Sequence, residues 1–379
     1  MSTPTAPIAI ARARFLIDTT PRSADISHVE GSTSHPPAKE IAMIRMGISL
    51  FGVSALMLAV PMPAFSQAKK TERIAIADPA KLKDNADFAT QGEYLGSSAD
   101  GKETWGAQVV ARGDGKFEAK YLKGGLPGAG GDVKSAVTLK GQRNGSVVEL
   151  KDGDKLIAVI DGDTIHSKDP KGFPLKKVAR TSPTLGAKPP EGAVVLFGQA
   201  SDIANWENGK LSELSDGQFL AAANVRSKKK FQSFKAHVEF RLAWMPNSTG
   251  QQRSNSGCYL QDRYEVQVLD SFGLKGVDNE CGGIYRESAP QVNMCLPPMV
   301  WQTYDIEFQA AKFDGDGKKT SPATVTVVHN GVTIHDRLNL KAPTPGGKFN
   351  KETPEPGPLF LQDHSDPVVF RNIWIVEMK

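Results

Sequence analysis

The sequence predicts an all-β protein, with a β-sandwich or jelly roll in its C-terminal half and a smaller β domain before it. Alternation of apolar and polar residues recurs along the chain, whereas no long stretch shows the 3.6-residue period of an amphipathic helix. Turn-forming pairs such as Asn330-Gly331 separate the alternating stretches, and Asn-Gly is a strong signal for a two-residue hairpin. Many short strands with no helices between them are typical of sandwiches and jelly rolls.

Two N-terminal segments, residues 1–42 and 43–68, are expected to lie outside the folded protein. Residues 47–60 are apolar and uncharged, but the run is shorter than the roughly 20 residues that a spanning helix needs. Ser66 and Ala68 supply small residues at the −3 and −1 positions of a cleavage site, so residues 43–68 are interpreted as a cleaved signal peptide. We therefore expect a periplasmic or secreted protein without a membrane anchor after cleavage. Residues 1–42 lack strong periodicity and are interpreted as a disordered, non-native extension from an over-extended gene start.

The rest of the chain divides at a stretch rich in Pro and Gly. Residues 69–180 are expected to form the small β domain, with two strands in 104–122 and a meander in 137–165. Residues 181–192 lack apolar periodicity and are interpreted as a linker. Residues 193–379 then form the sandwich, where 234–244, 324–338, 359–364 and 368–376 are the clearest strand patterns. The small β domain shows no catalytic constellation.

The distribution of charge and the spacing of Cys and His residues argue against nucleic acid and zinc as partners. The net charge of +4 is spread over both halves of the chain, and its one run of like charge, at residues 228–230, is interpreted as a solvated turn. Nucleic acid is therefore not an expected partner. No CxxC or HxxxH spacing accompanies the cysteines, so no zinc site and no cofactor are predicted. Nothing in the sequence supports a requirement for a divalent metal.

The three cysteines all lie in the C-terminal half. Cys281 and Cys295 flank a loop rich in Gly, Pro and Asn, and export would permit a disulfide, so we predict a bond between them. Closing such a loop is worth roughly 3 kcal/mol in the chain-entropy model. Cys258 lies within an alternating strand and is expected to be a small buried apolar residue.

Polar residues alternate with apolar ones on three strands. In 264–270 the apolar set opposes Glu265 and Gln267, and in the upstream part of 254–270 it opposes Tyr259 and Gln261. The strand at 359–364 repeats the pattern, with Gln362 and His364 away from the apolar set. Neutral amides with two donors and two acceptors suit sugar hydroxyls. On alternation alone, a carbohydrate-handling face and an ordinary solvated face are equally good interpretations.

The order of several motifs resembles the 3-keto-disaccharide hydrolase domain family. The resemblance covers about half of the chain and leaves out the small β domain. It implies a concanavalin/LamG-like jelly roll with a concave groove for sugars, and it implies that Gln261, Glu265, Gln267, Gln362 and His364 meet in that groove. The motifs are VVLF (194–197), VEFRL (238–242), NSGCYL (255–260), RYEVQVLDS (263–271), CGGIY (281–285), WQTYDIEF (301–308) and GPLFLQDHSDPVVFRNIWI (357–375).

The same resemblance implies cleavage of glycosides oxidised at C3. A ketone at C3 acidifies the C2 proton, so a base could remove it, C1 could lose its substituent and water could then add. We expect Glu265 as the base, His364 as the acid or enolate stabiliser, and Arg263 or Arg371 as a charge partner if either reaches the groove. The candidate catalytic residues are thus Glu265, His364 and Asp270, and the candidate substrate-binding residues are Asn255, Tyr259, Gln261, Arg263, Gln267 and Gln362.

Three other interpretations remain open from the sequence. A conventional hydrolase with two carboxylates would need a pair about 5–5.5 Å or 6.5–9.5 Å apart. A non-catalytic, lectin-like carbohydrate-binding module would need the groove alone. A role in cell-surface adhesion or structural scaffolding would rest only on the extra β domain.

Overall fold

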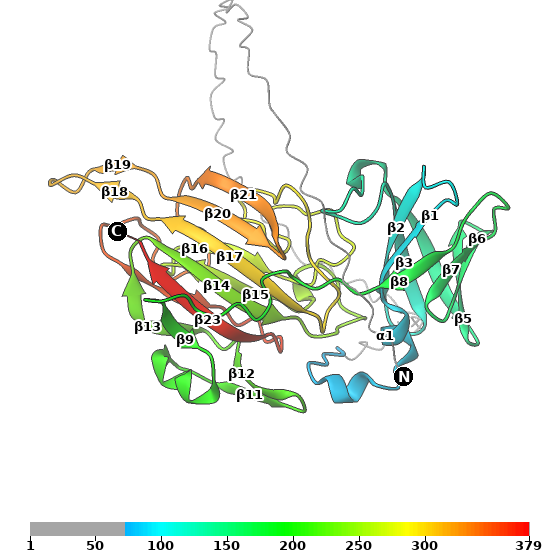
Figure 1. The fold of residues 1–379 in the computed structure, drawn as a ribbon. Helices are drawn as coiled ribbons and strands as arrows, with labels where there is room; N and C mark the ends of the chain where they lie inside the picture. The colour runs from blue at the N-terminus through cyan, green and yellow to red at the C-terminus, as the bar shows by residue number, and fades with distance from the viewer. Residues whose placement is uncertain (1–72, 379) are drawn as a thin grey trace, which may run out of the picture. The chain divides into compact units, whose positions relative to one another are not determined.

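The structure is a computed structural model that describes residues 73–378. The predicted N-terminal extension and signal peptide lie outside the described residues. The part of the chain that is described is almost entirely β and belongs to one compact unit (Figure 1). Within it, no helix is long and apolar enough to cross a bilayer.

The N-terminal strands form a closed barrel in which each strand pairs antiparallel with the next and β8 returns to β1. Closure removes the exposed edges that an open sheet of this size would leave. The strands are β1 (Gly92–Ser97), β2 (Thr104–Ala111), β3 (Lys116–Lys123), β4 (Val137–Asn144), β5 (Val147–Asp152), β6 (Lys155–Asp161), β7 (Thr164–Ser167) and β8 (Leu175–Val178). The two strands expected in 104–122 and the meander expected in 137–165 are confirmed.

A short helix covers one end of this barrel. Helix α1 (Ala86–Thr90) begins at Asn85, whose side chain accepts a hydrogen bond from Phe88 N at 2.9 Å, an N-cap interaction. The Phe88 ring packs on the barrel core and meets Trp244 edge-on, with ring centroids 5.9 Å apart. Short 3-10 helices lie at Pro79–Leu82, Val133–Ser135, Ala200–Asn205 and Gly250–Gln252.

The C-terminal part is a sandwich of two antiparallel sheets, which confirms the predicted fold class. The five-stranded sheet has the order β10-β13-β22-β15-β16, and the larger one has the order β11-β12-β23-β14-β17-β20-β21 with β9 paired to β23. The smaller sheet consists of β10 (Trp206–Glu207), β13 (Val225–Phe231), β15 (Ser256–Leu260), β16 (Tyr264–Val268) and β22 (Gly357–Leu361). The larger consists of β9 (Val194–Phe197), β11 (Leu211–Leu214), β12 (Gly217–Ala221), β14 (Phe234–Arg241), β17 (Trp301–Gln309), β20 (Thr324–His329), β21 (Val332–Asn339) and β23 (Val369–Glu377). A separate hairpin pairs β18 (Lys312–Phe313) with β19 (Lys319–Ser321).

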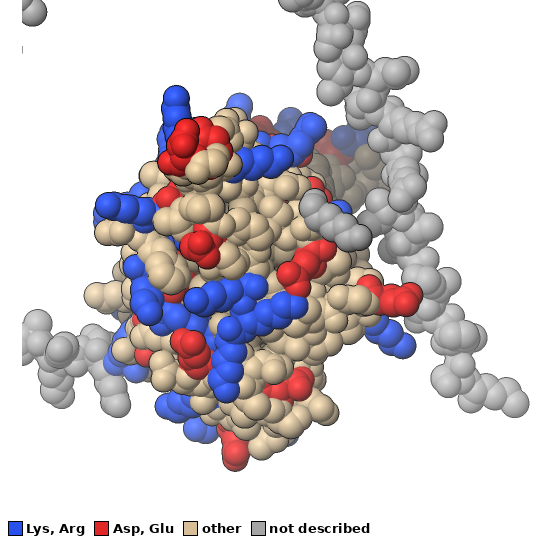
Figure 2. Space-filling model, turned by 90° about the vertical axis from the view of Figure 1, so that its left-hand side faces the viewer, with Lys and Arg blue, Asp and Glu red and all other residues tan. Residues whose placement is uncertain are grey.

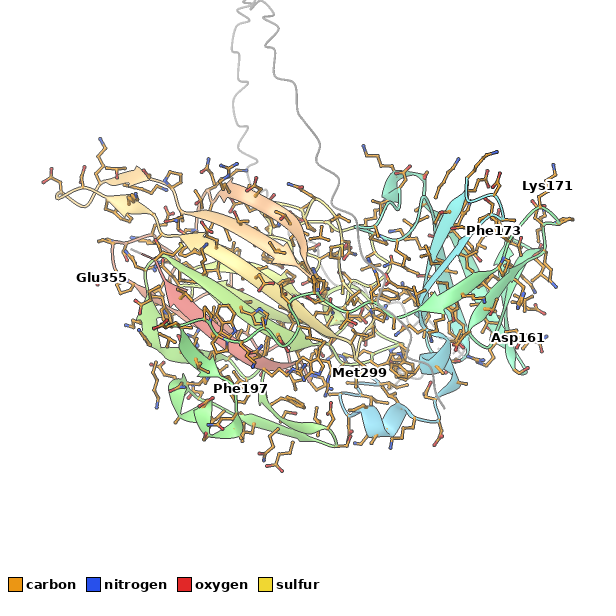
Figure 3. The ribbon with its side chains drawn as sticks, viewed as in Figure 1. Asp161, Lys171, Phe173, Phe197, Met299 and Glu355 are labelled. Atoms are coloured by element: carbon orange, nitrogen blue, oxygen red, sulfur yellow. The ribbon has the colours of Figure 1, made fainter. Side chains whose placement is uncertain are left out.

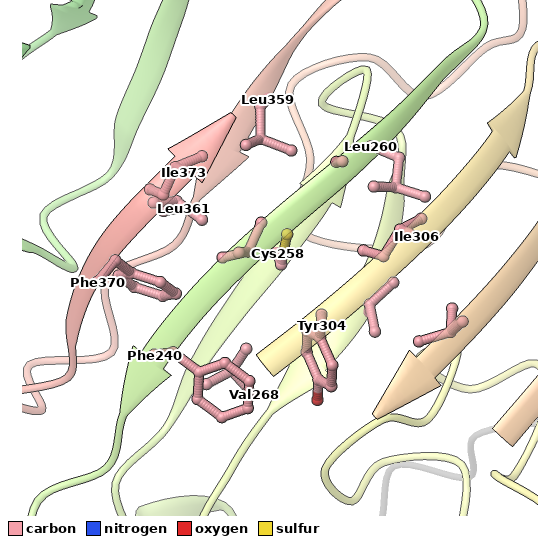
Figure 4. Packing of buried hydrophobic residues seen from close by; sticks show 14 of the residues in the cluster. Phe240, Cys258, Leu260, Val268, Tyr304, Ile306, Leu359, Leu361, Phe370 and Ile373 are labelled. Carbon is pink, nitrogen blue, oxygen red and sulfur yellow. The ribbon is translucent and has the colours of Figure 1, made fainter. Parts of the chain in front are cut away.

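The apolar face of each strand fills the space between the two sheets. Cys258 and Leu260 from β15 and Leu359 and Leu361 from β22 pack against Phe240 and other residues of the facing sheet (Figure 4). Asn330 and Gly331 both have positive φ, at 49° and 81°, as the tight turn between β20 and β21 requires. Alternation therefore identified the core faces correctly, including the buried thiol of Cys258, whose pKa burial raises to about 12.

The predicted disulfide is wrong, because all three cysteines are free and buried. Cys281 Sγ lies 3.2 Å from Tyr304 Oη, and Cys295 Sγ contacts the Leu269 carbonyl at 3.5 Å. Loop-closure entropy measures what a bond would contribute, but not whether the two sulfur atoms reach bonding geometry.

The linker lies against the outer face of the larger sheet. Residues 182–187, called the linker strap below, cover His237 and Glu239 of β14, which are both fully buried. Gly186 N donates to Glu239 Oε1 at 2.5 Å and Thr184 Oγ1 donates to Asp305 Oδ2 at 2.6 Å. His237, Glu239 and Arg241, which alternate with the apolar residues of 234–244, thus form ion pairs with little exposure rather than a solvated face.

Candidate active site

A cavity of about 200 Å³ lies over the polar side of β15 and β16. Its lining includes side chains from both strands, from the chain just after β22, and from two loops. The lining residues are Gln251, Tyr259, Glu265, Gln267, Tyr285, Arg286, Pro345, Gly346, Gln362 and His364. All ten residues of β15 and β16 are buried, so the interpretation of this side as an ordinary solvated face is wrong.

Glu265 and Tyr259 form the centre of the cavity. They lie directly opposite each other in the β15–β16 ladder, and cross-strand neighbours of this kind have side chains on the same face. Tyr259 Oη donates to Glu265 Oε2 at 2.8 Å. The hairpin register therefore places a phenol beside a carboxyl group that is only 3% exposed.

Two glycines leave the space that this pair occupies. A Cβ atom on Gly257 would lie 2.5 Å from Glu265 Oε1, and one on Gly346 would lie 2.3 Å from Tyr259 Oη. Gly346 also has φ +98°, a backbone conformation that side chains disfavour. Both positions therefore require glycine for the carboxyl and the phenol to meet.

Burial changes the chemistry of Glu265. Desolvation raises its pKa to about 8, against the smaller lowering effect of the hydrogen bond from Tyr259. Among the described residues no cation forms an ion pair with it. A carboxyl group with this pKa can accept or donate a proton near neutral pH, as a general base or acid must.

The single proton of Tyr259 links the state of Glu265 to a loop carbonyl. Tyr259 Oη lies 2.8 Å from Glu265 Oε2 and 2.9 Å from Pro345 O, and it can donate to only one of them at a time. Burial and the nearby carboxylate raise the pKa of Tyr259, so the phenol keeps its proton. It can thus donate to ionised Glu265, or accept from protonated Glu265 while donating to Pro345.

Gln362 and His364 extend this network. Strand β22 ends at Leu361, so both residues lie just beyond it, where the predicted strand had included them. Gln362 Nε2 donates to Tyr259 Oη at 3.2 Å, and Gln362 Oε1 lies 2.9 Å from His364 Nε2. Because the amide oxygen can only accept, His364 Nε2 carries a proton in this arrangement. His364 is exposed and lies at the open side of the cavity.

A second set of amides positions Gln267. Its Nε2 donates to Asn255 Oδ1 at 2.7 Å and to Ser256 O at 3.0 Å. Asn255 Nδ2 in turn donates to Gln251 O at 2.8 Å. Within the described part of the chain no donor contacts Gln267 Oε1, so this atom can accept a hydrogen bond from a ligand hydroxyl. Asn255 supports Gln267 and does not line the cavity.

The loop after Cys281 supplies the only arginine of the lining. Residues 282–285 run along the free edge of β16, where Tyr285 N donates to Glu265 O at 3.2 Å. Arg286 has φ +57° in the tight turn that follows and lies over the Tyr285 ring, 5.4 Å from its centroid. Sequence reasoning missed both residues as site members, although the CGGIY motif ends at Tyr285.

The comparisons with known proteins concern the C-terminal half of the chain. A sequence model described as a 3-keto-alpha-glucoside-1,2-lyase-like domain matches residues 192–376. The C-terminal domain belongs to this family. No curated protein matches the chain.

Solved structures from Parabacteroides distasonis are also similar to the chain. One, described as "a putative glycosyl hydrolase" and solved at 2.13 Å, is 36% identical with a TM-score of 0.43, covering 50% of this chain and 85% of its own. A second with the same description, solved at 1.70 Å, is 16% identical with a TM-score of 0.34, covering 50% of this chain and 95% of its own.

Three residues predicted for the site lie elsewhere in this 3-keto-glucoside lyase-like domain. Gln261 has φ +54° in the β15–β16 turn, which directs its amide to Phe231 O at 2.9 Å. Arg263 donates to Lys351 O and Thr353 Oγ1 beside a different cavity. Arg371 pairs with Glu239 on the other sheet at 2.7 Å. Alternation fails at Gln261 because the strand has already ended.

Asp270 is also outside the cavity of the lyase-like domain. It is fully buried and pairs with Arg253, with Nε and Oδ2 2.7 Å apart. Desolvation raises its pKa although the arginine opposes this. Glu265 is consequently the only carboxylate among the residues that line the candidate site.

Other surface features of the described part of the molecule lack a hydrogen-bonded network like that of Glu265 and Tyr259. A larger cavity of about 930 Å³ is lined by Lys120, Lys134, Lys275, Glu118 and Glu280, without the linked network of the lyase-like site. One face of the molecule shows Lys and Arg gathered near its middle with Asp and Glu around them (Figure 2). In the described residues no group of three or more His, Cys, Asp or Glu side chains is arranged to hold a metal ion.

Proposed function

We propose that the C-terminal domain cleaves 3-keto-glycosides by removing the C2 proton, eliminating the C1 substituent and adding water. The observation that carries this proposal is the isolated, buried Glu265, whose pKa of about 8 suits a base that works near neutral pH. The family description, a 3-keto-alpha-glucoside-1,2-lyase-like domain, refers to C1 and C2, the two carbons of the proposed elimination.

Glu265 is assigned the first step. Its carboxylate takes the C2 proton, and the electron pair of the C–H bond moves toward the C3 ketone to give an enolate. Tyr259, which donates to Glu265 Oε2, holds the carboxylate in place. Burial also keeps Glu265 poorly solvated, so that proton transfer to it costs no large rearrangement of water.

Arg286 and His364 are assigned to the charges that develop next. Arg286 lines the cavity, and a guanidinium near the C3 oxygen would stabilise the enolate. His364 Nδ1 has no partner in the described residues. In the imidazolium form, which keeps the Nε2 proton on Gln362, Nδ1 would donate its own proton to the oxygen that leaves C1. Arg286 thus replaces Arg263 and Arg371 as the proposed charge partner of the enolate.

The second half of the reaction restores the enzyme. Collapse of the enolate breaks the C1–O bond and leaves a C1–C2 double bond conjugated to the ketone. Water then adds at C1 and gives one proton to His364, which replaces the proton lost to the leaving group, and protonated Glu265 returns its proton to C2. The net change is hydrolysis of the glycoside, with no redox step.

A hydrolase with two carboxylates receives no support from the lining. That mechanism needs a second Asp or Glu within about 10 Å across the scissile bond. Glu265 is the only carboxylate that lines the cavity, and Asp270 is buried in an ion pair with Arg253.

The decisive experiment is a turnover assay with a 3-keto-α-glucoside, run with and without a divalent metal chelator. Glu265→Gln should lower kcat/KM by about 10²-fold or more, since positioned acid–base groups contribute about 10²- to 10⁴-fold. Glu355→Gln, the same chemical change outside this cavity, should leave kcat/KM unchanged (Figure 3). Full activity of Glu265→Gln would refute the assignment.

The same assay decides on the alternative of a lectin-like module. That alternative predicts binding of sugars by the wild type with no turnover of oxidised or ordinary glycosides. His364→Ala adds a second check, because it should lower kcat more for a substrate with a poor leaving group than for one with a good leaving group.

We also propose that the protein is exported. The support is the apolar run at residues 47–60 with small residues before the predicted cleavage point. N-terminal sequencing of the protein from a native host should give Lys69 as the first residue, and a mature chain that retains residues 47–60 would refute export by cleavage.

A further inference from the structure

The barrel has a cavity of about 430 Å³ at the end opposite α1. Its lining comes from the start of β2, the end of β3, the start of β6, the end of β7 and the segment before β8, which antiparallel pairing brings to one end of the barrel. The lining residues are Glu103, Trp105, Tyr121, Ile157, Ser167, Asp169, Lys171, Gly172, Phe173 and Leu175. Eight-stranded barrels have room for one small ligand at the mouth.

Three aromatic rings form the walls of this barrel mouth. Trp105 and Tyr121 share the inward-facing register of the buried Ala107 and Ala119, and Phe173 precedes β8 in the register of Leu175. All three pack on the barrel core yet stay half-buried. Figure 3 labels Phe173 and Lys171 on this part of the barrel. Flat aromatic surfaces that remain accessible offer stacking area to a ligand ring.

One polar atom in the mouth has no partner. Tyr121 Oη is buried and makes no hydrogen bond within the described residues. Burial raises the pKa of this phenol, so it keeps its proton and can both donate and accept. A buried hydroxyl without a partner is destabilising, and a hydrogen bond to a ligand hydroxyl would remove that cost.

Charged and hydroxyl side chains surround the aromatic walls. The loop before β8 is fixed by hydrogen bonds from Asp169 N to Ser167 Oγ at 3.0 Å and from Lys171 N to Asp169 Oδ1 at 2.9 Å. In the described residues, the side chains of Glu103 and Lys171 have no hydrogen-bond or ion-pair partner. A lipid chain would not match such a rim, whereas a ligand with one apolar face and many hydroxyls would.

We infer that the barrel mouth is a saccharide-binding subsite, separate from the cavity of Glu265. The apolar face of a pyranose ring would stack on Trp105 or Phe173, one hydroxyl would pair with Tyr121 Oη, and others would reach Glu103, Asp169 or Lys171. The choice of gluco-configured sugars as ligands rests on the proposed function. The geometry of the mouth does not depend on it.

Calorimetric titration of the full chain with trehalose, maltose and cellobiose tests the inference. None of these sugars carries the C3 ketone, so binding is measured without turnover. Tyr121→Phe, which removes only the unpartnered hydroxyl, should weaken binding of the best ligand by about fivefold or more. Trp105→Ala should weaken it by about tenfold or more through loss of a stacking surface.

Tyr94→Phe is the matched control. It removes a phenol hydroxyl from the same barrel, but that hydroxyl already donates to Thr90 O at 2.7 Å, near α1. Its affinity for the sugar should equal that of the wild type. Tyr121→Phe should also keep the wild-type kcat/KM on a small 3-keto-glucoside.

The inference is overturned if the wild type binds none of the three sugars, or if Tyr121→Phe and Trp105→Ala, folded by circular dichroism, both bind as tightly as the wild type. Its failure is distinct from failure of the proposed function. If the protein binds sugar through Tyr121 but shows no turnover, the subsite is supported and the proposed enzymatic function is refuted. If it shows turnover but no sugar binding that depends on Tyr121, the subsite is refuted and the proposed function stands.

Discussion

At the scale of single residues, the ionisation of Glu265 controls the proposed chemistry. The pKa of about 8 means that the carboxylate form, which acts as base, is a minority at neutral pH. We expect kcat/KM for a 3-keto-glucoside to rise with pH through about 8 and then level off. A pH–rate profile measures this, and a profile that is flat from below pH 6 upward would contradict the role of Glu265.

The same carboxyl group should make stability depend on pH. The pKa of Glu265 is raised from 4.5 to about 8 in the folded state, so its contribution is fully present below the unfolded value and is lost as pH rises through the folded one. Glu265→Gln removes this dependence. Urea unfolding should therefore show the variant gaining stability over the wild type between pH 5 and 9, by a few kcal/mol at about 1.4 kcal/mol per pKa unit. An unchanged difference would mean that Glu265 is ionised at both pH values.

Glycines and loop residues show where single-residue prediction from sequence stops. The NSGCYL motif contains Gly257, but the need for glycine there depends on where Glu265 Oε1 lies in three dimensions. Arg286 enters the cavity through a tight turn at φ +57°. No periodicity describes such a turn, so the sequence offered Arg263 and Arg371 instead.

At the scale of elements, alternation predicted the hairpin of β15 and β16 well. It placed Tyr259, Glu265 and Gln267 on one side and the apolar residues on the other, as the structure has them. Alternation could not predict that loops cover this side of the hairpin. A two-residue period separates the two faces of a strand, but it does not show what packs on each face. It also failed one residue past the strand end, at Gln261.

The linker strap is an element whose contacts can be tested. Burial opposes ionisation of His237, but hydrogen bonds to Asp305 and Glu239 outweigh it and raise the pKa of His237 to about 9. Burial also opposes ionisation of Glu239, whose bonds from His237, Asn372 and Arg371 nevertheless lower its pKa to about 2. These opposing shifts describe an ion cluster that is charged at neutral pH, with the strap above it.

Glu239→Gln should destabilise the protein by about 3 kcal/mol, because it removes the carboxylate that pairs with Arg371 and one of the two that bond to the buried imidazolium of His237. The measurement is urea unfolding at pH 7. Glu307→Gln is the control, since the pair of Glu307 with Lys235 is about half exposed and such pairs contribute about 0–1 kcal/mol. Equal losses in the two variants would show that the cluster under the strap adds no stability of its own.

At the scale of the whole molecule, the sequence predicted the order of the parts but not their closure. The small β domain was recognised from its turns, yet the pairing of β8 with β1 joins segments far apart in the chain. Alternation is the same in an open meander and in a closed barrel. The mouth of the barrel, with its aromatic walls, exists only because of that closure.

The lyase-like domain should need more of the chain than the family match covers. The family match begins at residue 192, but the linker strap before it bonds Glu239 and Asp305 and its Ala187 O accepts from Asn372 Nδ2 at 3.0 Å. A chain that begins at residue 192 should therefore be less stable than one that begins at residue 181. Hydrogen bonds to charged groups contribute about 1.5–3 kcal/mol each, and a loss of 1 kcal/mol lowers Tm by about 2–4 °C in a domain of this size.

We expect the shorter chain to unfold at least about 5 °C below the longer one in a calorimetric scan. The longer chain is the matched control, since both lack the barrel and differ only in the strap and the residues beside it. Equal Tm values would show that the strap is a passive linker. The Glu265 cavity is built from residues after 250, so both chains should keep the wild-type pH dependence of kcat/KM at temperatures where they are folded.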